Sequence, residues 1–567
     1  MRNPIMEFSQ VSQCLLCHDA PCTKVCPRVD PARILRAIRF ENDLGAAMLL
    51  PDDDICSTCG SVCVTACPTK TPIPEILSVL REHATQMEEA PCAESVDLSC
   101  EICGVPLENP FLLSSSVVAS NYEMCARAFE MGWAGVAYKT ICLMDIHETS
   151  PRFSAMKGRD GAFYGFKNIE QLSPHKLEED LAVFTRLKQN YPSKVLVVSI
   201  MGRDEQEWAY LAETATKAGA DVIECNFSCP NMEEKDVGVD VGQDPEAVRR
   251  YTAAVRRATH LPVLAKMTPN LADMRPAARA AIEAGANGIA AINTLKSITN
   301  VNLDTYVTAP SVRGRSSVGG YSGAAVKPIA LRFMADLGAD PALKDAHLSG
   351  MGGIETWRDA VEFLLLGAGS LQVTTAVMQY GYRIIDDLLS GLRIYMAQRG
   401  YDRISQMVGA AVENVVDLDD LERDTIVYPR FRRDRCVGCG RCYLSCRDGG
   451  HQALRFDEER RQPVLIPQNC VGCHLCLLVC PQNAISSSRK RMRHRPYTKA
   501  LSRSETGAGT SEAALCRAFL ILQTLRIKPT TCCWASRLMP FGAMNVWVSL
   551  RMMQIFKLLQ TRLNLLR

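Results

Sequence analysis

Sixteen of the 26 cysteines fall into four groups of four, and closely spaced thiolates are strong ligands for iron and zinc. Two groups lie in the C-terminal half, each with the spacing C-x2-C-x2-C-x3-C: Cys436, Cys439, Cys442 and Cys446, followed by Cys470, Cys473, Cys476 and Cys480. This doubled spacing is typical of proteins that hold two [4Fe-4S] clusters. The sequence therefore predicts single-electron chemistry at this end of the chain.

In this pattern, three cysteines of one run and the last cysteine of the other bind each cluster. We therefore assign the eight residues to two crossed sets: Cys436, Cys439, Cys442 with Cys480, and Cys470, Cys473, Cys476 with Cys446. The first run ends in "CRD" rather than "CP", which leaves the ligands intact. We expect a small two-cluster domain, similar to ferredoxin, over residues 416–486.

Two further groups lie near the N-terminus: Cys14, Cys17, Cys22 and Cys26 in "CLLCHDAPCTKVCP", and Cys56, Cys59, Cys63 and Cys67 in "CSTCGSVCVTACP". A helical pattern, "DPARILRAIRFENDLGAAMLL", separates them. We expect two more [4Fe-4S] clusters in a helical module over residues 1–95, with zinc as the alternative metal. The second spacing is irregular, so the pairing of the ligands and a ligand other than cysteine stay open.

Five more cysteines are candidates for structural roles. Cys100 and Cys103 lie in "LSCEICGVPLENP", a predicted hairpin leading into a domain, where a structural role is favoured over a metal site. Cys125 and Cys142 are predicted core residues, as is Cys225, because free cysteine is often buried.

Cys229 stands apart, between a short apolar strand and a proline in "ECNFSCPN". It could be a core thiol, a metal ligand or a catalytic acid. A ligand role is disfavoured because the nearest cysteine lies four residues earlier, on a strand. A thiol with a pKa near 8.5 is mostly protonated at neutral pH and can still donate its proton. We therefore favour Cys229 as a proton donor.

Between residues 96 and 415 short β-rich segments alternate with amphipathic helices, which predicts parallel β/α units. The expected strands are Phe111–Ser115, Gly135–Lys139, Val195–Met201, Val222–Ser228, Val263–Thr268, Gly288–Asn293, Ala346–Ser349 and Ser370–Thr374. Eight strands over about 300 residues predict an α/β fold, a (β/α)8 TIM barrel.

Catalytic residues of such barrels lie at the C-terminal ends of the strands. Polar residues are expected there: Lys139, Thr140, Asn226, Cys229, Lys266, Asn293, Thr294, Gly352, Gly353, Thr374 and Thr375. Two lysines and two glycine-rich late loops, "SGMGGI" and "GAGSLQVTT", predict a cofactor with a phosphate. The sequence has no GxGxxG motif between a strand and a helix, so we expect no NAD(P)H-binding domain in this chain.

Several motifs together resemble the FMN barrel of the dihydroorotate dehydrogenase superfamily: "ECNFSCPN", "LAKMTPN", "GGYSGAAVKPIALR", "SGMGGI" and "LQVTTAVM". The two cluster motifs after the barrel make the chain similar, more specifically, to the dihydropyrimidine dehydrogenases. The N-terminal "CLLCHDAPCTKVCP" resembles the iron–sulfur module of that family and of the glutamate synthase small subunit. The resemblance covers about residues 13–486.

The resemblance implies a role for each matching residue. Cys229 would be the general acid, and Asn226, Asn293 and Thr294 would bind the pyrimidine. FMN would be held by Ser114, Lys139, Thr140, Lys266, Gly352, Gly353, Thr374 and Thr375. The implied reaction reduces uracil or thymine to the 5,6-dihydropyrimidine, by hydride transfer from FMN and protonation by Cys229, with electrons arriving through the clusters.

The sequence departs from the family in two places. Where the family has an asparagine for the pyrimidine after the third strand, this chain reads "SIMGRDEQEW", and we expect Asp204 in its place. The FAD and NAD(P)H domains, which single-chain relatives place before the barrel, are missing. We therefore expect a separate FAD- and NAD(P)H-binding partner subunit, and an oligomer.

Two alternatives remain at this stage. The barrel could act on dihydroorotate or reduce another cyclic enone or imide, although the carboxylate of dihydroorotate would need a cation beyond the two flavin-binding lysines. Alternatively, the chain could be an electron-transfer subunit of an oxidoreductase complex. A proton donor such as Cys229 argues against that role, because an electron conduit needs none.

Charge is distributed unevenly along the chain. Residues 487–567 contain 15 Lys and Arg against 2 Asp and Glu, whereas the rest contains 49 against 60, so the body is not a predicted nucleic-acid binder. The basic tail could lie on an anionic membrane surface or bind a partner, or it could be disordered or frame-altered. With no signal-peptide core at residues 1–10 and no apolar run of 18 to 20 residues, we expect a cytoplasmic protein.

Overall fold

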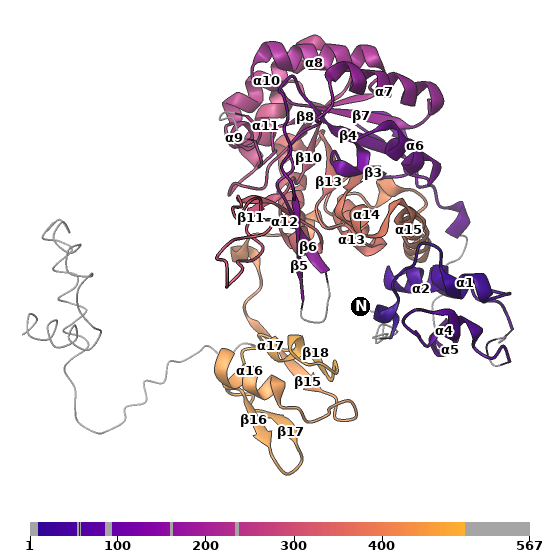
Figure 1. The fold of residues 1–567 in the computed structure, drawn as a ribbon. Helices are drawn as coiled ribbons and strands as arrows, with labels where there is room; N and C mark the ends of the chain where they lie inside the picture. Colours follow the sequence, from indigo (N-terminus) through magenta and orange to yellow (C-terminus); the bar gives the residue numbers. More distant parts are fainter. Residues whose placement is uncertain are drawn as a thin grey trace, which may run out of the picture. The chain divides into compact units, whose positions relative to one another are not determined.

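The computed structural model describes residues 10–53, 56, 58–84, 93–158, 163–232 and 237–493 (Figure 1). The chain divides into two compact units, Met1–Leu421 and Glu422–Arg567. The first unit holds the N-terminal helical module and the barrel. The predicted basic tail lies, from residue 494 onward, outside the described residues.

A closed barrel of eight parallel strands forms the centre of the first unit, so the predicted TIM barrel is confirmed. In chain order its strands are β3 (Phe111–Leu113), β4 (Gly135–Ile141), β7 (Val195–Ile200), β8 (Val222–Asn226), β9 (Val263–Lys266), β10 (Gly288–Ala291), β13 (His347–Met351) and β14 (Ser370–Val373). Each matches one of the eight expected segments. The last strand pairs with the first, with Leu371 opposite Phe111 and Val373 opposite Leu113.

Helices surround the barrel, as expected for β/α units (Figure 1). They are α6 (Tyr122–Glu130), α7 (Leu177–Asn190), α8 (Glu205–Ala218), α9 (Val239–Gln243), α10 (Pro245–Ala258), α11 (Arg275–Glu283), α12 (Lys327–Gly338), α13 (Trp357–Leu365), α14 (Thr375–Tyr380) and α15 (Ile385–Arg399). In α8 the buried residues Trp208, Leu211, Ala212 and Ala215 recur at helical spacing on the face toward the strands.

A second sheet, which the sequence did not predict, is built from insertions after β4 and β10. Its four antiparallel strands follow the order β11-β12-β6-β5. Their bounds are β5 (Phe153–Lys157), β6 (Phe163–Asn168), β11 (Leu295–Ser297) and β12 (Gly319–Ser322). We call these four strands the insertion sheet.

Before the barrel, the hairpin β1 (Cys100–Ile102) and β2 (Val105–Leu107) confirms the hairpin predicted around Cys100 and Cys103. The predicted core cysteines Cys125, Cys142 and Cys225 are all buried. No helix among the described residues is both long and apolar enough to cross a membrane.

The N-terminal module is helical, as predicted, and packs on the barrel helices. Its helices are α1 (Pro21–Val25), α2 (Pro31–Arg39), α3 (Asp43–Ala47), α4 (Val62–Ala66) and α5 (Ile73–Ala84). The guanidinium of Arg36 bonds the buried carboxylate of Asp387 on α15 at 2.6 Å. The indole N–H of Trp357 donates to the carbonyl of Glu41 at 2.8 Å.

The second unit contains β15 (Thr425–Phe431), α16 (Arg441–Gly449), β16 (Leu454–Asp457), β17 (Gln462–Leu465), α17 (Leu475–Leu478) and β18 (Ile485–Arg493). β15 pairs with β18, and β16 pairs with β17, both antiparallel. Strand β18 continues to Arg493, seven residues beyond the boundary expected at Ser486.

The contact between the module and the barrel gives a first prediction. Arg36→Ala should lower the free energy of unfolding of the first unit by about 3–5 kcal/mol, because it removes the guanidinium from a buried carboxylate, Asp387. Urea unfolding followed by tryptophan fluorescence measures the loss. The matched control is Arg28→Ala, whose ion pair with Asp53 is exposed and should contribute about 0–1 kcal/mol. Equal losses in the two variants would contradict a stabilising role for the interface.

Candidate active site

A cavity open to solvent lies at the C-terminal ends of the barrel strands. With the exception of Asp204, every residue predicted for the cofactor, the substrate or the proton transfer lines it: Ser114, Lys139, Thr140, Asn226, Cys229, Lys266, Asn293, Thr294, Gly352, Gly353, Thr374 and Thr375. The barrel thus brings together residues from seven strands or the loops after them. Their individual chemical roles stay predictions.

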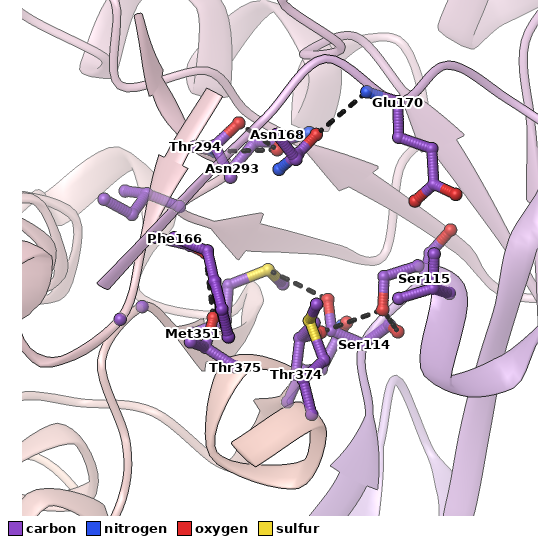
Figure 2. A pocket seen from close by; sticks show the side chains of 18 of the residues that line it. Ser114, Ser115, Phe166, Asn168, Glu170, Asn293, Thr294, Met351, Thr374 and Thr375 are labelled. Carbon is purple, nitrogen blue, oxygen red and sulfur yellow. Dashed lines mark hydrogen bonds between the residues drawn. The ribbon is translucent and has the colours of Figure 1, made fainter. Parts of the chain in front are cut away.

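Two groups of polar side chains face each other across the cavity (Figure 2). Asn293 and Thr294, after β10, lie on one side with Asn168 from β6. The hydroxyls after β3 and β14 lie on the other side, where Ser116 and Thr374 are hydrogen-bonded at 3.1 Å. A bound molecule would therefore contact amides on one side and hydroxyls on the other.

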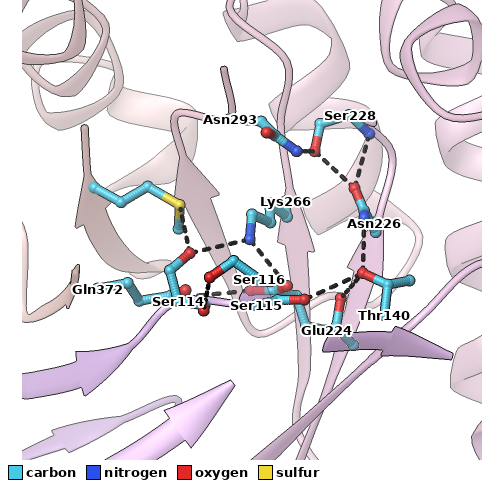
Figure 3. Close-up of polar contacts among 12 residues, drawn as sticks. Ser114, Ser115, Ser116, Thr140, Glu224, Asn226, Ser228, Lys266, Asn293 and Gln372 are labelled. Atoms are coloured by element: carbon cyan, nitrogen blue, oxygen red, sulfur yellow. Dashed lines mark hydrogen bonds and ion pairs between the residues drawn. The ribbon is translucent and has the colours of Figure 1, made fainter. Parts of the chain in front are cut away.

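Hydrogen bonds fix the orientation of the two predicted substrate asparagines (Figure 3). The amide of Asn226 donates to the hydroxyl of Thr140 at 2.9 Å, and its oxygen accepts from the hydroxyl of Ser228 at 2.8 Å. The amide of Asn293 donates to the same serine oxygen at 2.8 Å. Ser228 therefore couples the two amides, which keeps both side chains in place before any ligand binds.

Cys229 lies in the cavity wall and is only 6% exposed. Burial raises the pKa of its thiol to about 11, with the backbone N–H of Asn231 and the two cavity lysines acting in the opposite direction. The thiol is therefore protonated at neutral pH, as a proton donor must be.

Both lysines of the cavity have carboxylate partners. The ammonium of Lys139 lies 3.2 Å from Glu170 and 3.7 Å from Glu148, and all three side chains are largely buried. Burial raises the pKa of Glu148. On the barrel floor, the ammonium of Lys266 lies 3.4 Å from Glu224 and 3.3 Å from the hydroxyl of Ser114.

Asn168 and Glu170 are among the polar residues of the cavity wall that sequence reasoning missed. Asn168 ends β6, and the backbone N–H of Glu170 donates to its side-chain oxygen (Figure 2). Both come from the insertion sheet and the loop after it, outside the eight strands that the prediction followed. The polar run "KNIEQ" at the end of a second β-rich segment was the available signal.

The prediction for Asp204 was wrong. Its side chain caps helix α8 by accepting from the backbone N–H groups of Gln206 and Glu207, both at 2.9 Å. Aspartate is favoured at this position because it satisfies amides that a helix leaves without partners. Asp204 is not among the residues that line the cavity.

The lining of the cavity fits a polar cofactor such as FMN. Four lining side-chain atoms are buried and have no hydrogen-bond partner among the residues that the structure describes: Asn231 Oδ1, Tyr321 Oη, Glu355 Oε1 and Gln372 Oε1. Buried polar atoms of this kind are destabilising unless a ligand or water pairs with them. Gly352 and Gly353 have φ angles of 120° and 85°, a backbone shape that favours glycine and lets the chain approach a ligand closely.

The C-terminal cysteines surround two cavities of the second unit. One cavity is lined by Cys436, Cys439, Cys442 and Cys480, and the other by Cys446, Cys470, Cys473 and Cys476. These are the two crossed sets predicted from the spacing. Among the described residues, no three His, Cys, Asp or Glu side chains converge on a point that could hold a single metal ion.

In the N-terminal module, some cysteines of one sequence group lie close to cysteines of the other group. Burial raises the pKa of Cys14, and the neighbouring thiols Cys17 and Cys67 raise it further. Burial likewise raises the pKa of Cys63 to about 11, with contributions from Cys26, Cys59 and Cys56. Cys67 therefore lies near Cys14 and Cys22 of the first group, and Cys26 lies near Cys63 of the second.

Comparison with known proteins agrees with this geometry. The family model described as dihydroorotate dehydrogenase matches residues 97–396, and a 4Fe-4S dicluster domain matches residues 430–487. The chain is 56% identical to the NAD-dependent dihydropyrimidine dehydrogenase subunit PreA of Escherichia coli K12, over 69% of this chain and 95% of that protein.

Two other relatives are more distant. The chloroplastic dihydropyrimidine dehydrogenase (NADP(+)) of Arabidopsis thaliana is 36% identical, over 57% of this chain and 79% of that protein. The catalytic subunit of dihydroorotate dehydrogenase B (NAD(+)) from Pyrococcus abyssi is 38% identical, over 56% of this chain and 99% of that protein. With its barrel, its cavity and its cluster motifs, the chain belongs to the dihydroorotate dehydrogenase family and carries a C-terminal 4Fe-4S dicluster domain.

Proposed function

We propose that this chain reduces a neutral pyrimidine base, uracil or thymine, to its 5,6-dihydro form. The observation that carries the proposal is the convergence of a protonated buried thiol, Cys229, with two oriented amides, Asn226 and Asn293, on one cavity. Its closest support among the relatives described above is the 56% identity to a dihydropyrimidine dehydrogenase subunit.

FMN would be held between the two lysines and the late glycine and threonine loops, and it would supply the hydride for C6 of the pyrimidine ring. Asn226 and Asn293 would bind the imide edge of the ring, since an amide offers both a donor and an acceptor. The thiol of Cys229 would give its proton to C5. Hydride and proton together account for the two electrons and two hydrogen atoms that the ring gains.

Charge in the cavity favours a neutral ring over orotate or dihydroorotate. A carboxylate substrate would need a cation that is not already neutralised. Lys139 has two carboxylate neighbours, Glu148 and Glu170, and Lys266 has Glu224. Arg152 lies 3.9 Å from both Glu148 and Glu170, so it also has carboxylate neighbours. Neither lysine that lines the cavity is therefore free to pair with a substrate carboxylate.

Electrons would reach the cavity through iron–sulfur clusters from a separate subunit that oxidises NAD(P)H. The PreA relative is itself named as a subunit, which supports a partner. In the N-terminal module the proposed ligand sets are Cys14, Cys17, Cys22 with Cys67, and Cys56, Cys59, Cys63 with Cys26. Supporting the first set, Cys67 helps to raise the pKa of both Cys14 and Cys22. Supporting the second set, Cys26 helps to raise the pKa of Cys63. All sixteen cysteines of the four quartets would then serve electron transfer.

The direct test is anaerobic reoxidation of the reduced flavin. Uracil should reoxidise it, and Cys229→Ala should slow the reaction by about 10²–10⁴-fold because the general acid is lost. Stopped-flow absorbance measures the rate. Cys225→Ala is the matched control, since this thiol is buried in the core and does not line the cavity, and it should keep the rate. Reoxidation by orotate would favour the dihydroorotate alternative, and no reoxidation by either would favour an electron-transfer subunit.

The pKa of Cys229 predicts the pH dependence of the same reaction. The thiol keeps its proton below its pKa of about 11, so the rate should be independent of this group from roughly pH 6 to pH 9. It should fall only as the pH approaches 11. A decline centred near an ordinary thiol pKa of about 8.5 would show that burial does not protect the proton.

The crossed cluster ligands give a prediction about iron content. Cys480→Ser combined with Cys442→Ser should remove one cluster, about four iron atoms, because both residues line one cavity. Cys480→Ser combined with Cys476→Ser should remove two clusters, about eight iron atoms, because these residues line different cavities. Iron analysis of the purified variants measures the loss. The reverse order would mean that each sequence run binds its own cluster.

A further inference from the structure

The barrel interior contains a carboxylate that neither the predicted roles nor the proposed reaction uses. Glu224, on β8, is fully buried in the barrel and does not line the cavity. A buried ionised carboxylate is costly unless it is paired. Its position beneath the cavity floor therefore needs an explanation.

Glu224 lies between Lys266 on the floor of the cavity and Gln372 (Figure 3). One of its oxygens lies 3.4 Å from the ammonium of Lys266, and the other accepts from the amide of Gln372 at 3.4 Å. From Gln372 the hydrogen bonds continue through Ser349 and Ser370 to His347, at 3.3, 2.9 and 2.8 Å.

The hydrogen-bonded residues beyond Gln372, which are Ser349, Ser370 and His347, supply no second cation. Burial lowers the pKa of His347 to about 4, so its ring is neutral at physiological pH. The serines and Gln372 are uncharged. The net charge beneath the cavity floor is therefore set by Lys266 and Glu224 alone, and the two cancel.

We propose that Glu224 is a positioning residue that lowers the reduction potential of the bound flavin by neutralising Lys266. This inference rests on the proposed flavin site. Lysine alone on the floor would stabilise the negative charge that a flavin gains on reduction, which makes the reduced flavin a weaker hydride donor. The carboxylate of Glu224 lies 3.4 Å from the ammonium of Lys266 and offsets its positive charge. The lysine itself stays in place to hold the cofactor.

Other charged groups lie around the cavity, and Arg152 is 3.9 Å from both Glu148 and Glu170. Lys139 on β4 is occupied by Glu148 and Glu170 from the insertion after β4. Glu355, after β13, also lines the cavity, and burial raises its pKa to about 7. The thiol of Cys229 is protonated at neutral pH. The predicted effect of Glu224 is therefore best measured at a fixed pH.

Glu224→Gln is a suitable variant because it keeps the shape and removes the charge. The amide introduced at position 224 needs an acceptor on the side of Gln372. The carbonyl oxygen of Gln372 is buried without a partner, so a flip of that side-chain amide provides one. The variant should therefore fold and keep its flavin.

The test is the two-electron midpoint potential of the flavin in the holoenzyme, measured by anaerobic reductive titration against a reference dye. Glu224→Gln should raise the potential by at least about 30 mV, which is a tenfold change in the ratio of reduced to oxidised flavin. Lys266→Met should lower it. In the Lys266→Met background the Glu224→Gln change should have no further effect, because a fully buried carboxylate that has lost its cation takes up a proton and carries no charge.

Two further variants keep the inference falsifiable. Ser370→Ala breaks the lower hydrogen bonds without changing charge and should leave the potential as it is. Glu224→Asp keeps the negative charge but places it farther from the ammonium of Lys266. The flavin potential of this variant should lie between those of the wild type and Glu224→Gln. An unchanged or lowered potential in Glu224→Gln, or the same shift in both backgrounds, would overturn the inference.

The experiment separates this inference from the proposed function. No pyrimidine is present in the titration, so a shifted potential stands whether or not uracil is the substrate. A chain that retains no flavin would instead refute the flavin site of the proposed function before the potential of any variant is compared.

Discussion

Closure of the barrel is the constraint on which the candidate site depends. The backbone N–H of Leu371 donates to the carbonyl of Pro110, and that of Ser114 donates to the carbonyl of Val373. These bonds join the first and last strands, which lie far apart in the sequence. Since closure removes every free edge, the strand ends form a single ring, and Ser114, Lys266 and Thr374 face one cavity.

The barrel and most of the candidate site were predictable because their signals are local. A buried parallel strand is a short apolar run, and its C-terminal end marks where a functional side chain can stand, as for Lys139 and Asn226. Asn168 and Glu170 were not predicted, because Asn168 ends a strand outside the barrel and Glu170 follows that strand. The prediction that Asp204 binds the substrate was wrong, because a polar residue just after a strand is equally suited to capping the next helix.

Other features depend on tertiary contacts that carry little sequence signal. The N-terminal cysteine spacing could not show that Cys67 lies near Cys14, because that proximity requires the module to be folded. The carboxylate of Glu224 sits in the middle of an apolar strand, and nothing near it in sequence indicates that Lys266 is its partner. A buried ion pair between neighbouring strands becomes visible only when the strands are placed side by side.

The insertion sheet has a consequence for how this family could diversify. Its strands arise from two excursions, after β4 and after β10, and they supply Phe166, Asn168 and Tyr321 to the cavity wall. The floor, with Lys266 and Glu224, belongs to the barrel itself. Mutations in the excursions can therefore reshape the wall of the cavity and leave the Lys266–Glu224 pair of the floor in place. The wall and the floor are thus open to independent selection.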